Sequence, residues 1–250
     1  MSKQLKNKIA IVTGASKGIG AGIARALGAA GAAVVVNYAS DKEGAERVVA
    51  DIVKADGRAV AVQADVAKAA DVARLYAETR KAFGVPSVIV NNAGVFKFLP
   101  LEELTTDELH RQFDINVLGA LLVAQEGLKH FGPEGASIIN VSSAVSTNSG
   151  PGSVLYASTK AALDSITLGL ARELGGRKIR VNAINPGPTE TEGVHSVGLM
   201  ESPMLQQFVA STPLGRMGQP GDMGPAVVFL ASDEAQWISG ETLRVAGGLR

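Results

Sequence analysis

The sequence predicts an α/β protein built on one doubly wound parallel sheet of about seven strands, with helices on both faces. Short, continuously apolar runs alternate with segments of helical periodicity along most of the 250 residues. Strands that are apolar at every position are typical of a parallel sheet covered on both sides. No Pro/Ser-rich linker or change of composition divides the chain, so we expect a single domain over residues 1–250.

The expected strands are the short apolar runs, several of which end in glycine or in polar residues. They cover residues 9–12, 33–36, 59–62, 88–90, 137–141, 179–184 and 242–245. Ligands of open parallel sheets bind beyond the carboxyl ends of the strands. The residues that follow each run are therefore the first candidates for a functional site.

The expected helices are the segments in which apolar residues recur with a period near 3.6. They cover residues 19–30, 41–55, 68–83, 106–130, 154–174 and 222–231. The stretch that follows the sixth strand, up to about residue 219, has no strong periodicity and is expected to be irregular. Within it we expect a substrate lid at about 189–212, because this segment follows a strand end.

The composition excludes several classes of protein. Lys plus Arg and Asp plus Glu both number 24, so the net charge is zero and neither a nucleic acid nor an anionic membrane is expected as partner. The chain has no cysteine and only three histidines, so no metal site is expected. No apolar run is long enough to span a membrane, and we expect a cytoplasmic protein.

A glycine-rich turn directly follows the first expected strand and opens the first helix. Gly14, Gly18 and Gly20 are spaced G-x3-G-x-G, with Ser16, Lys17 and Ile19 between them. Glycines permit a sharp turn and a close approach of phosphate to the backbone. The free N–H groups of the helix N-terminus suit a pyrophosphate. This turn therefore predicts dinucleotide binding.

The same turn also has the pattern G-x-S-x-G, with Ser16 at its centre. That pattern is the nucleophile elbow of serine hydrolases and offers a function of a different class. The elbow needs Asp and His partners at later strand ends, but His195 lies in a polar stretch with only Glu nearby. We therefore favour the dinucleotide over the hydrolase.

The end of the second strand bears on which dinucleotide is bound. The residues there that could contact the adenosine ribose are Asn37, Tyr38, Ala39 and Ser40. A carboxylate at this place would favour NAD, whereas the neutral Asn37 does not repel a 2′-phosphate, and Lys17 supplies positive charge. NADP(H) is thus predicted over NAD(H). Asp41 could still face the ribose, but we interpret it as a helix N-cap.

Tyr156 and Lys160 lie at positions i and i+4 near the start of an expected helix, on one face. A nearby ammonium favours the phenolate and lowers the pKa of the tyrosine from about 10. Such a tyrosine can exchange a proton with a carbonyl or alcohol oxygen. Tyr38 and Lys42 repeat the spacing, but only Tyr156 follows a hydroxyl-bearing strand end, at Ser143.

In these motifs the chain resembles the short-chain dehydrogenase/reductase family, from the first strand to the last Gly-Gly. The matching blocks are 13–20, Asp65-Val66, 91–94, Asn116, Ser143, the Tyr156/Lys160 pair and 185–187. The resemblance implies a single-domain Rossmann-type fold, NAD(P)(H) as cofactor and a homotetramer. The two long helices, 106–130 and 154–174, are natural subunit contacts.

The resemblance also implies a role for each matching residue. Tyr156 would be the general acid/base, and Lys160 would lower its pKa and hold the nicotinamide ribose. Ser143 would polarise the substrate carbonyl, and Asn116 would help to hold a water that relays protons to Lys160. The remaining implied cofactor contacts are Asp65 and Val66 at the adenine, Asn92, Ala93 and Gly94 near the ribose and nicotinamide, and Pro186, Gly187, Thr189 and Thr191 near the nicotinamide amide and pyrophosphate.

The expected activity is the reversible, NADPH-dependent reduction of a ketone to a secondary alcohol. The apolar residues near the expected pocket favour a hydrophobic or aryl ketone, although they could equally pack the lid or a subunit interface. They are Phe96, Phe98, Val194, Val197, Leu199, Met200, Met204, Leu205 and Phe208. Segments 213–218 and 229–234 resemble 3-oxoacyl-[acyl-carrier-protein] reductases and glucose dehydrogenases. Such a reductase, a glucose or polyol dehydrogenase and a non-enzymatic dinucleotide-binding protein are the alternatives.

Overall fold

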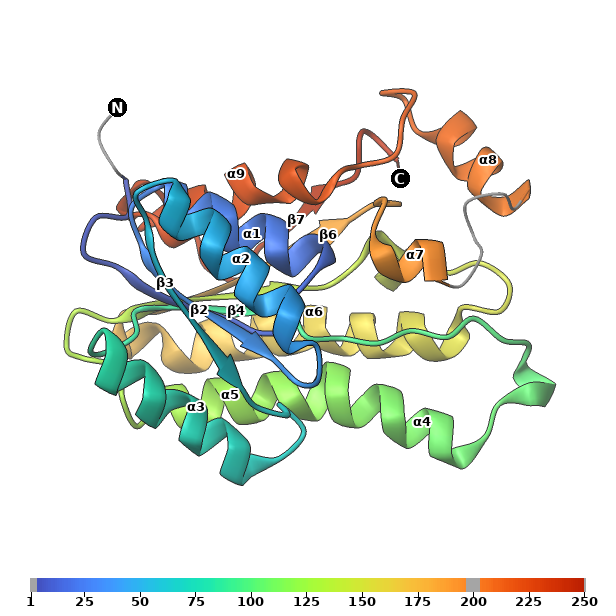
Figure 1. Cartoon of the computed structure of the whole chain (residues 1–250). Helices are drawn as coiled ribbons and strands as arrows, with labels where there is room; N and C mark the ends of the chain where they lie inside the picture. The colour runs from blue at the N-terminus through green and yellow to red at the C-terminus, as the bar shows by residue number, and fades with distance from the viewer. Residues whose placement is uncertain (1–3, 197–202, 250) are drawn as a thin grey trace.

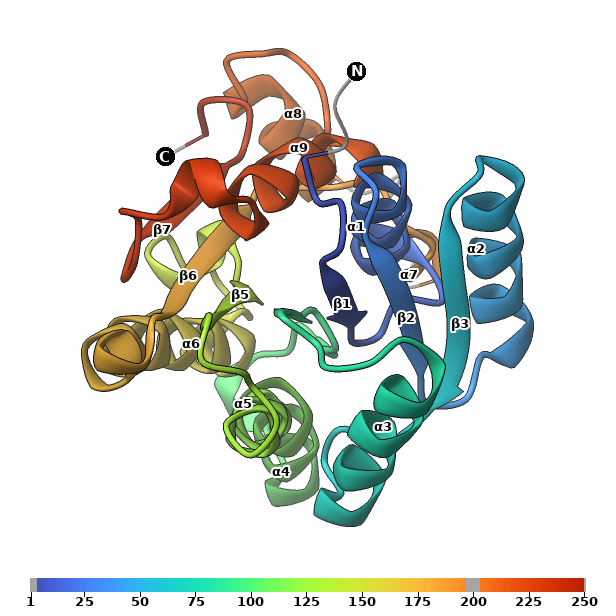
Figure 2. The ribbon, with the colours of Figure 1, turned by 90° about the vertical axis from the view of Figure 1, so that its left-hand side faces the viewer.

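The computed structural model describes residues 4–196 and 203–249. Within them, parallel strands form one sheet in the order β3-β2-β1-β4-β5-β6-β7 (Figures 1 and 2). The strands are β1 (Ile9–Val12), β2 (Ala33–Tyr38), β3 (Arg58–Gln63), β4 (Val88–Asn91), β5 (Ala136–Val141), β6 (Ile179–Pro186) and β7 (Thr242–Val245). The predicted Rossmann-type sheet is confirmed. The strand order reverses between β1 and β4, which is where such sheets bind ligands.

Helices cover both faces of the sheet (Figure 2). One face carries α1 (Gly18–Ala29), α2 (Lys42–Lys54) and α9 (Pro220–Ala231), and α1 packs along α9. The other face carries α3 (Ala69–Ala82), α4 (Thr106–Phe113), α5 (Gly119–Gly127) and α6 (Val154–Leu174). Short 3-10 turns occupy Leu101–Glu103, Ala144–Ser146, Gly175–Arg177 and Asp233–Ala235.

Each central strand contributes to two separate cores. In β1, Ala10 and Val12 lie in the cluster under α1, α2 and α9, whereas Ile11 lies in the cluster under α3 and α5. All three side chains are fully buried. Because both faces of the strand are covered, its sequence is apolar at every position instead of alternating. This explains why the strands could be predicted from short apolar runs.

The long helix expected over 106–130 is interrupted and ends earlier. A π-helical turn, Asp114–Leu118, separates α4 from α5, and α5 ends at Gly127. The turn contains Asn116, whose buried amide bonds the backbone of Val95 on a neighbouring loop. Tertiary hydrogen bonds therefore override a regular helix that the local periodicity would favour.

The segment expected to be irregular contains two short helices, α7 (Glu192–Ser196) and α8 (Pro203–Ser211). Helices of five and nine residues are too short to show a clear 3.6-residue period. Val197, Leu199 and Met200 lie outside the described residues, as do the side chains of Met204, Leu205 and Phe208. In the described ranges, no helix has both the length and the apolar character needed to cross a membrane.

Candidate active site

The glycine-rich turn lies at the carboxyl end of β1 and begins α1. Gly14 and Gly18 have φ angles of +60° and +56°, in the left-handed region that favours glycine. A Cβ on Gly14 would lie 2.8 Å from the Cα of Ala93, and one on Gly20 would collide with the Asn92 amide. The glycines therefore let the turn pack closely against the end of β4.

Glu192 of α7 contacts the glycine-rich turn. Its Oε2 accepts a hydrogen bond of 3.0 Å from the backbone N–H of Gly18, the first residue of α1. A carboxylate thus occupies part of the anion-binding end of this helix. The sequence analysis did not identify Glu192, because 174 residues separate it from Gly18 and no motif connects them.

The structure shows which groups the Asn37 side chain bonds. This side chain is buried, and its Nδ2 donates to the carbonyl oxygens of Val62 and Ala64 at 3.2 and 3.0 Å. Its Oδ1 accepts from the N–H of Gly14 at 3.2 Å. Asn37 therefore connects β3 to the glycine-rich turn, and both ends of its amide are bonded to backbone groups.

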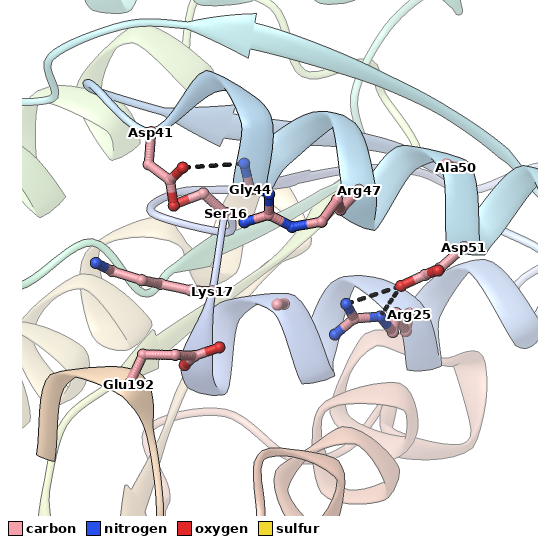
Figure 3. A pocket seen from close by; sticks show the side chains of 10 residues that line it. Ser16, Lys17, Arg25, Asp41, Gly44, Arg47, Ala50, Asp51 and Glu192 are labelled. Atoms are coloured by element: carbon pink, nitrogen blue, oxygen red, sulfur yellow. Dashed lines mark hydrogen bonds and ion pairs between the residues drawn. The ribbon is translucent and has the colours of Figure 1, made fainter. Parts of the chain in front are cut away.

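A hollow of about 300 Å³ lies between the start of α1 and α2 (Figure 3). It is lined by Ser16, Lys17, Ala21, Arg25, Asp41, Gly44, Arg47, Ala50, Asp51 and Glu192. Arg25 pairs with Asp51 at 2.9 Å, and Arg47 lies 3.9 Å from Glu43. Lys17 is exposed and makes no ion pair within the described part of the chain. Among the described residues, the Lys17 ammonium therefore has no carboxylate partner and is available to an anion in this hollow.

Asp41 is the N-cap of α2, as predicted. Its Oδ1 accepts a hydrogen bond of 2.9 Å from the N–H of Gly44. Tyr38, Ala39 and Ser40 precede it at the end of β2, and only Ala39 and Ser40 are exposed there. Lys42, the lysine of the second Tyr/Lys pair, forms an ion pair with Glu46 on α2.

The end of β4 connects the glycine-rich turn to the opposite side of the site. Asn92 Nδ2 donates to the carbonyl oxygens of Thr13 and Gly14 at 2.9 and 3.0 Å. A Cβ built on Gly94 would lie 3.5 Å from Lys160 Nζ and 3.3 Å from Asn116 Oδ1. The loop after β4 therefore runs between the turn and the predicted catalytic residues.

Ser143, Tyr156 and Lys160 lie together where β5 meets α6. The Ser143 hydroxyl hydrogen-bonds the Tyr156 phenol. Lys160 Nζ lies 5.7 Å from the centroid of the Tyr156 ring and donates to the carbonyl oxygen of Val141 at 2.9 Å. Lys160 is only 4% exposed. One hydroxyl, one phenol and one ammonium thus converge on the same end of the sheet.

The pKa of Tyr156 differs from the expectation. Burial raises the pKa of Tyr156 to about 12, and the Ser143 hydrogen bond lowers it only in part. Burial lowers the pKa of Lys160 to about 8, against the opposing effect of Asp164. The cost of burying a charge outweighs the attraction that the i,i+4 spacing suggested. At neutral pH the phenol therefore carries its proton and the lysine is mostly charged.

Asn116 is a buried link between the loop after β4 and α6. Its Oδ1 accepts from the N–H of Val95 at 2.7 Å, and its Nδ2 donates to the Val95 carbonyl at 2.8 Å and to Thr159 Oγ1 at 3.0 Å. The amide is thus bonded to protein groups, as a buried polar side chain requires. Its contact with Thr159 holds the loop beside Lys160.

The residues predicted to contact the adenine and the nicotinamide end occupy opposite sides of the site. Asp65 accepts from the N–H of Ala67 at 3.1 Å and pairs with Lys68, while Val66 is buried. After β6, the Thr189 hydroxyl donates to the Gly187 carbonyl. Thr191 lies against Gly18, where a Cβ would be 3.4 Å from its Cγ2. Pro186 and Gly187 join this loop to the end of β6.

Two phenylalanines surround the Tyr156 ring. The centroids of Phe96 and Phe98 lie 5.8 and 6.0 Å from that of Tyr156, and 5.6 Å from each other. A Cβ on Gly193 of α7 would lie 3.7 Å from the Phe96 ring. The space beside the phenol is therefore bordered by aromatic surface and by α7.

Similarity to known proteins agrees with this geometry. A family model described as enoyl-(acyl carrier protein) reductase matches residues 14–250. An uncharacterized oxidoreductase of Methylorubrum extorquens is 53% identical over 250 residues, covering 100% of both chains. Versicolorin reductase 1 of Aspergillus parasiticus is 40% identical, covering 98% of this chain and 97% of its own. A short-chain dehydrogenase from Burkholderia cenocepacia in complex with NADP is 36% identical with a TM-score of 0.91, covering 98% of this chain and 99% of its own.

The fold and the site define an oxidoreductase of the Rossmann type. The chain belongs to the short-chain dehydrogenase/reductase family. This membership sets aside the hydrolase interpretation of Ser16.

Proposed function

We propose that the protein reduces a ketone to a secondary alcohol with NADPH, reversibly, and that Tyr156 is the proton donor. The observation that carries the proposal is the contact of Tyr156 with Ser143 beside the buried Lys160. The residues present fit a dinucleotide, since Gly14 and Gly18 have left-handed backbones at a helix N-terminus. A phosphate oxygen bound at Gly18 would take the place of the Glu192 carboxylate.

A bound NADPH would supply a hydride to the carbonyl carbon. Ser143 would donate a hydrogen bond to the carbonyl oxygen and Tyr156 would donate its proton to it. A phenol with a pKa near 12 is still a far stronger acid than the secondary alcohol formed, so the proton transfer is favourable. Lys160 would hold the nicotinamide ribose and stabilise the phenolate left on Tyr156.

The test is a panel assay that follows the absorbance of the reduced nicotinamide with NADPH and with NADH. The panel holds an aryl ketone, a diketone and an acetoacetyl thioester, with glucose tested in the oxidative direction. Turnover of an aryl ketone with NADPH supports the proposal. Preference for the thioester together with binding to acyl carrier protein would instead favour a carrier-protein reductase. Oxidation of glucose would favour a sugar dehydrogenase. Cofactor binding without any turnover would favour a non-enzymatic binding protein.

Reductase activity is expected to fall as the pH rises through about 8. The pKa of Lys160 is lowered to about 8 by burial, so the ammonium is present below that pH and is lost above it. Between pH 8 and 9 we expect kcat/KM to fall about fivefold, because the fraction of charged lysine falls by that factor. A Lys160→Arg variant keeps its charge, so its residual activity should not show this decline. A decline of equal size in the variant would contradict the assignment to Lys160.

Lys17 is proposed to contact the 2′-phosphate that distinguishes NADPH from NADH. It lines the hollow between α1 and α2 and makes no ion pair with any residue that the structure describes. Lys17→Ala should lower kcat/KM with NADPH about 10- to 100-fold, the usual value of a hydrogen bond to a charged group, and leave that with NADH within about twofold. The exposed Lys54→Ala serves as the control and should change neither value. An equal loss with both cofactors would place Lys17 at a phosphate that they share.

The substrate is proposed to be a hydrophobic or aryl ketone, held between Phe96, Phe98 and a lid formed by residues 189–212. Two aromatic rings beside the proton donor provide a surface on which a flat ring can stack. The lid would include α7, which lies against Phe96.

The protein is further proposed to be a homotetramer. Leu118 and Leu121, at and after the π-helical turn, and Leu168 on α6 expose about two-fifths of their surface each. These large apolar side chains lie on the two helical segments that the sequence analysis predicted as subunit contacts. Burying them against a second copy would remove apolar surface from water.

A further inference from the structure

A half-buried carboxyl group, that of Asp164, lies on the same side of α6 as the proposed catalytic pair. Asp164 follows Lys160 by four residues and Tyr156 by eight, so the three side chains project from one face of the helix. Asp164 Oδ2 accepts a hydrogen bond of 3.1 Å from Asn185 Nδ2 at the end of β6. Its Oδ1 is buried and has no hydrogen-bond partner within the described ranges. The sheet thus holds the carboxyl group in place without satisfying it.

Asn185 fixes the position of this carboxyl group. Its Nδ2 also donates to Ser146 Oγ at 3.1 Å, in the 3-10 turn that follows Ser143. The amide therefore connects α6 to the strand end that carries the proposed carbonyl-polarising hydroxyl. Like Asp164 Oδ1, the Asn185 Oδ1 atom is a buried acceptor without a hydrogen-bond donor in the part of the chain that the structure describes. A negative charge here needs a compensating positive charge.

Lys160 carries the positive charge that lies nearest to Asp164 along α6. Its ammonium is almost fully buried and donates a hydrogen bond to the Val141 carbonyl. From β5 and the loop after β4 it faces uncharged groups, while Asp164 on its own helix acts on it electrostatically. On the β7 side, Arg244 is paired with Asn185 in the strand ladder, but it is exposed and donates to Thr147.

We propose that Asp164 is a positioning residue that keeps Lys160 positively charged and, through Lys160, supports proton donation by Tyr156. The inference rests on the proposed function of the Tyr156/Lys160 pair. A carboxylate on the next turn of the same helix offsets part of the cost of burying the Lys160 ammonium. The carboxylate thereby offsets part of the burial that otherwise drives Lys160 toward its neutral form.

The test follows Lys160 directly, by ¹³C NMR of lysine labelled at Cε, in the full-length protein. The Lys160 signal is identified by its absence in Lys160→Gln. Asp164→Asn retains the shape and an acceptor for Asn185 but removes the charge. We expect the Lys160 titration midpoint to fall by about one pH unit, the size typical of a lost opposite charge. The alkaline decline of kcat/KM should move to lower pH by the same amount, with activity at pH 6 within about twofold.

Three further variants make the result specific. Asp164→Glu keeps the negative charge and should hold the Lys160 midpoint near the wild-type value. Asp164→Ser removes the charge and should lower the midpoint as Asp164→Asn does. With two neutral variants, the test remains possible if one of them folds poorly. Arg244→Gln should leave it unchanged. An unchanged midpoint in both neutral variants would overturn the proposal. A shifted midpoint with an unshifted rate profile would support the role of Asp164 and contradict the proposed function of Lys160.

Discussion

Tyr156→Phe is expected to reduce kcat for ketone reduction about 10³-fold while leaving the dissociation constant of NADPH within about threefold, since positioned acid catalysis contributes 10²- to 10⁴-fold. The substitution removes only the phenolic oxygen that contacts Ser143. The ring between Phe96 and Phe98 remains, so the pocket keeps its shape. Steady-state kinetics and a fluorescence titration of NADPH measure the two quantities separately.

Tyr76→Phe is the matched control, because it removes the same atom from a different buried tyrosine. Tyr76 lies on α3, and its hydroxyl donates to the Val123 carbonyl at 2.7 Å, away from the proposed site. This variant should lose about 1 kcal/mol of unfolding free energy, the usual value of a buried hydrogen bond, and keep its kcat. Turnover that survives in Tyr156→Phe would refute the role of this residue as the acid.

Gly20→Ala is expected to have the largest effect on stability. The new methyl group would collide with the Asn92 amide and lie 2.6 Å from the Gly14 carbonyl oxygen. The Asn92 amide cannot turn aside without losing its bonds to Thr13 and Gly14. We expect a loss of about 3 kcal/mol, the upper end for overpacking, which lowers Tm by roughly 6–12 °C for a domain of this size. Weaker NADPH binding should accompany it, because the same turn is proposed to hold the pyrophosphate.

Gly132→Ala is the control for this substitution. Gly132 is exposed, its φ is not in the left-handed region, and a Cβ there would meet no atom within 4 Å. Its free energy of unfolding should change by no more than about 0.5 kcal/mol. Differential scanning calorimetry of both variants checks the pair, and equal values would mean that the space around Gly20 adjusts freely.

Most of the fold could be predicted because each core strand is apolar on both faces. β1 and β7 begin and end at the predicted residues, as does α6. The π-helical turn could not be predicted, since its cause is the bond from Asn116 to Val95, a residue on another loop. The sequence analysis did not predict α7 and α8, because helices of only one to three turns are too short to show a 3.6-residue period.

The predicted site residues come together in space, but their energetics could not be read from spacing. The i,i+4 relation of Tyr156 and Lys160 specifies a shared helix face and does not specify how deeply that face is buried. Burial reverses the expected direction of the Tyr156 pKa. Asn37 shows the same limit, since a polar residue at a strand end can point to a ligand or, as here, to two neighbouring carbonyl groups.

The π-helical turn has a consequence for how this chain tolerates changes in length. Asp114–Leu118 contains one residue more than an α-helix would need to join α4 to α5. A single-residue deletion there would produce a longer, more regular helix with better local hydrogen bonding. It would also remove or displace the Asn116 amide, which bonds both Val95 and Thr159, and so release the loop beside Lys160. At this position, selection for a more regular helix and selection for an intact site act in opposite directions.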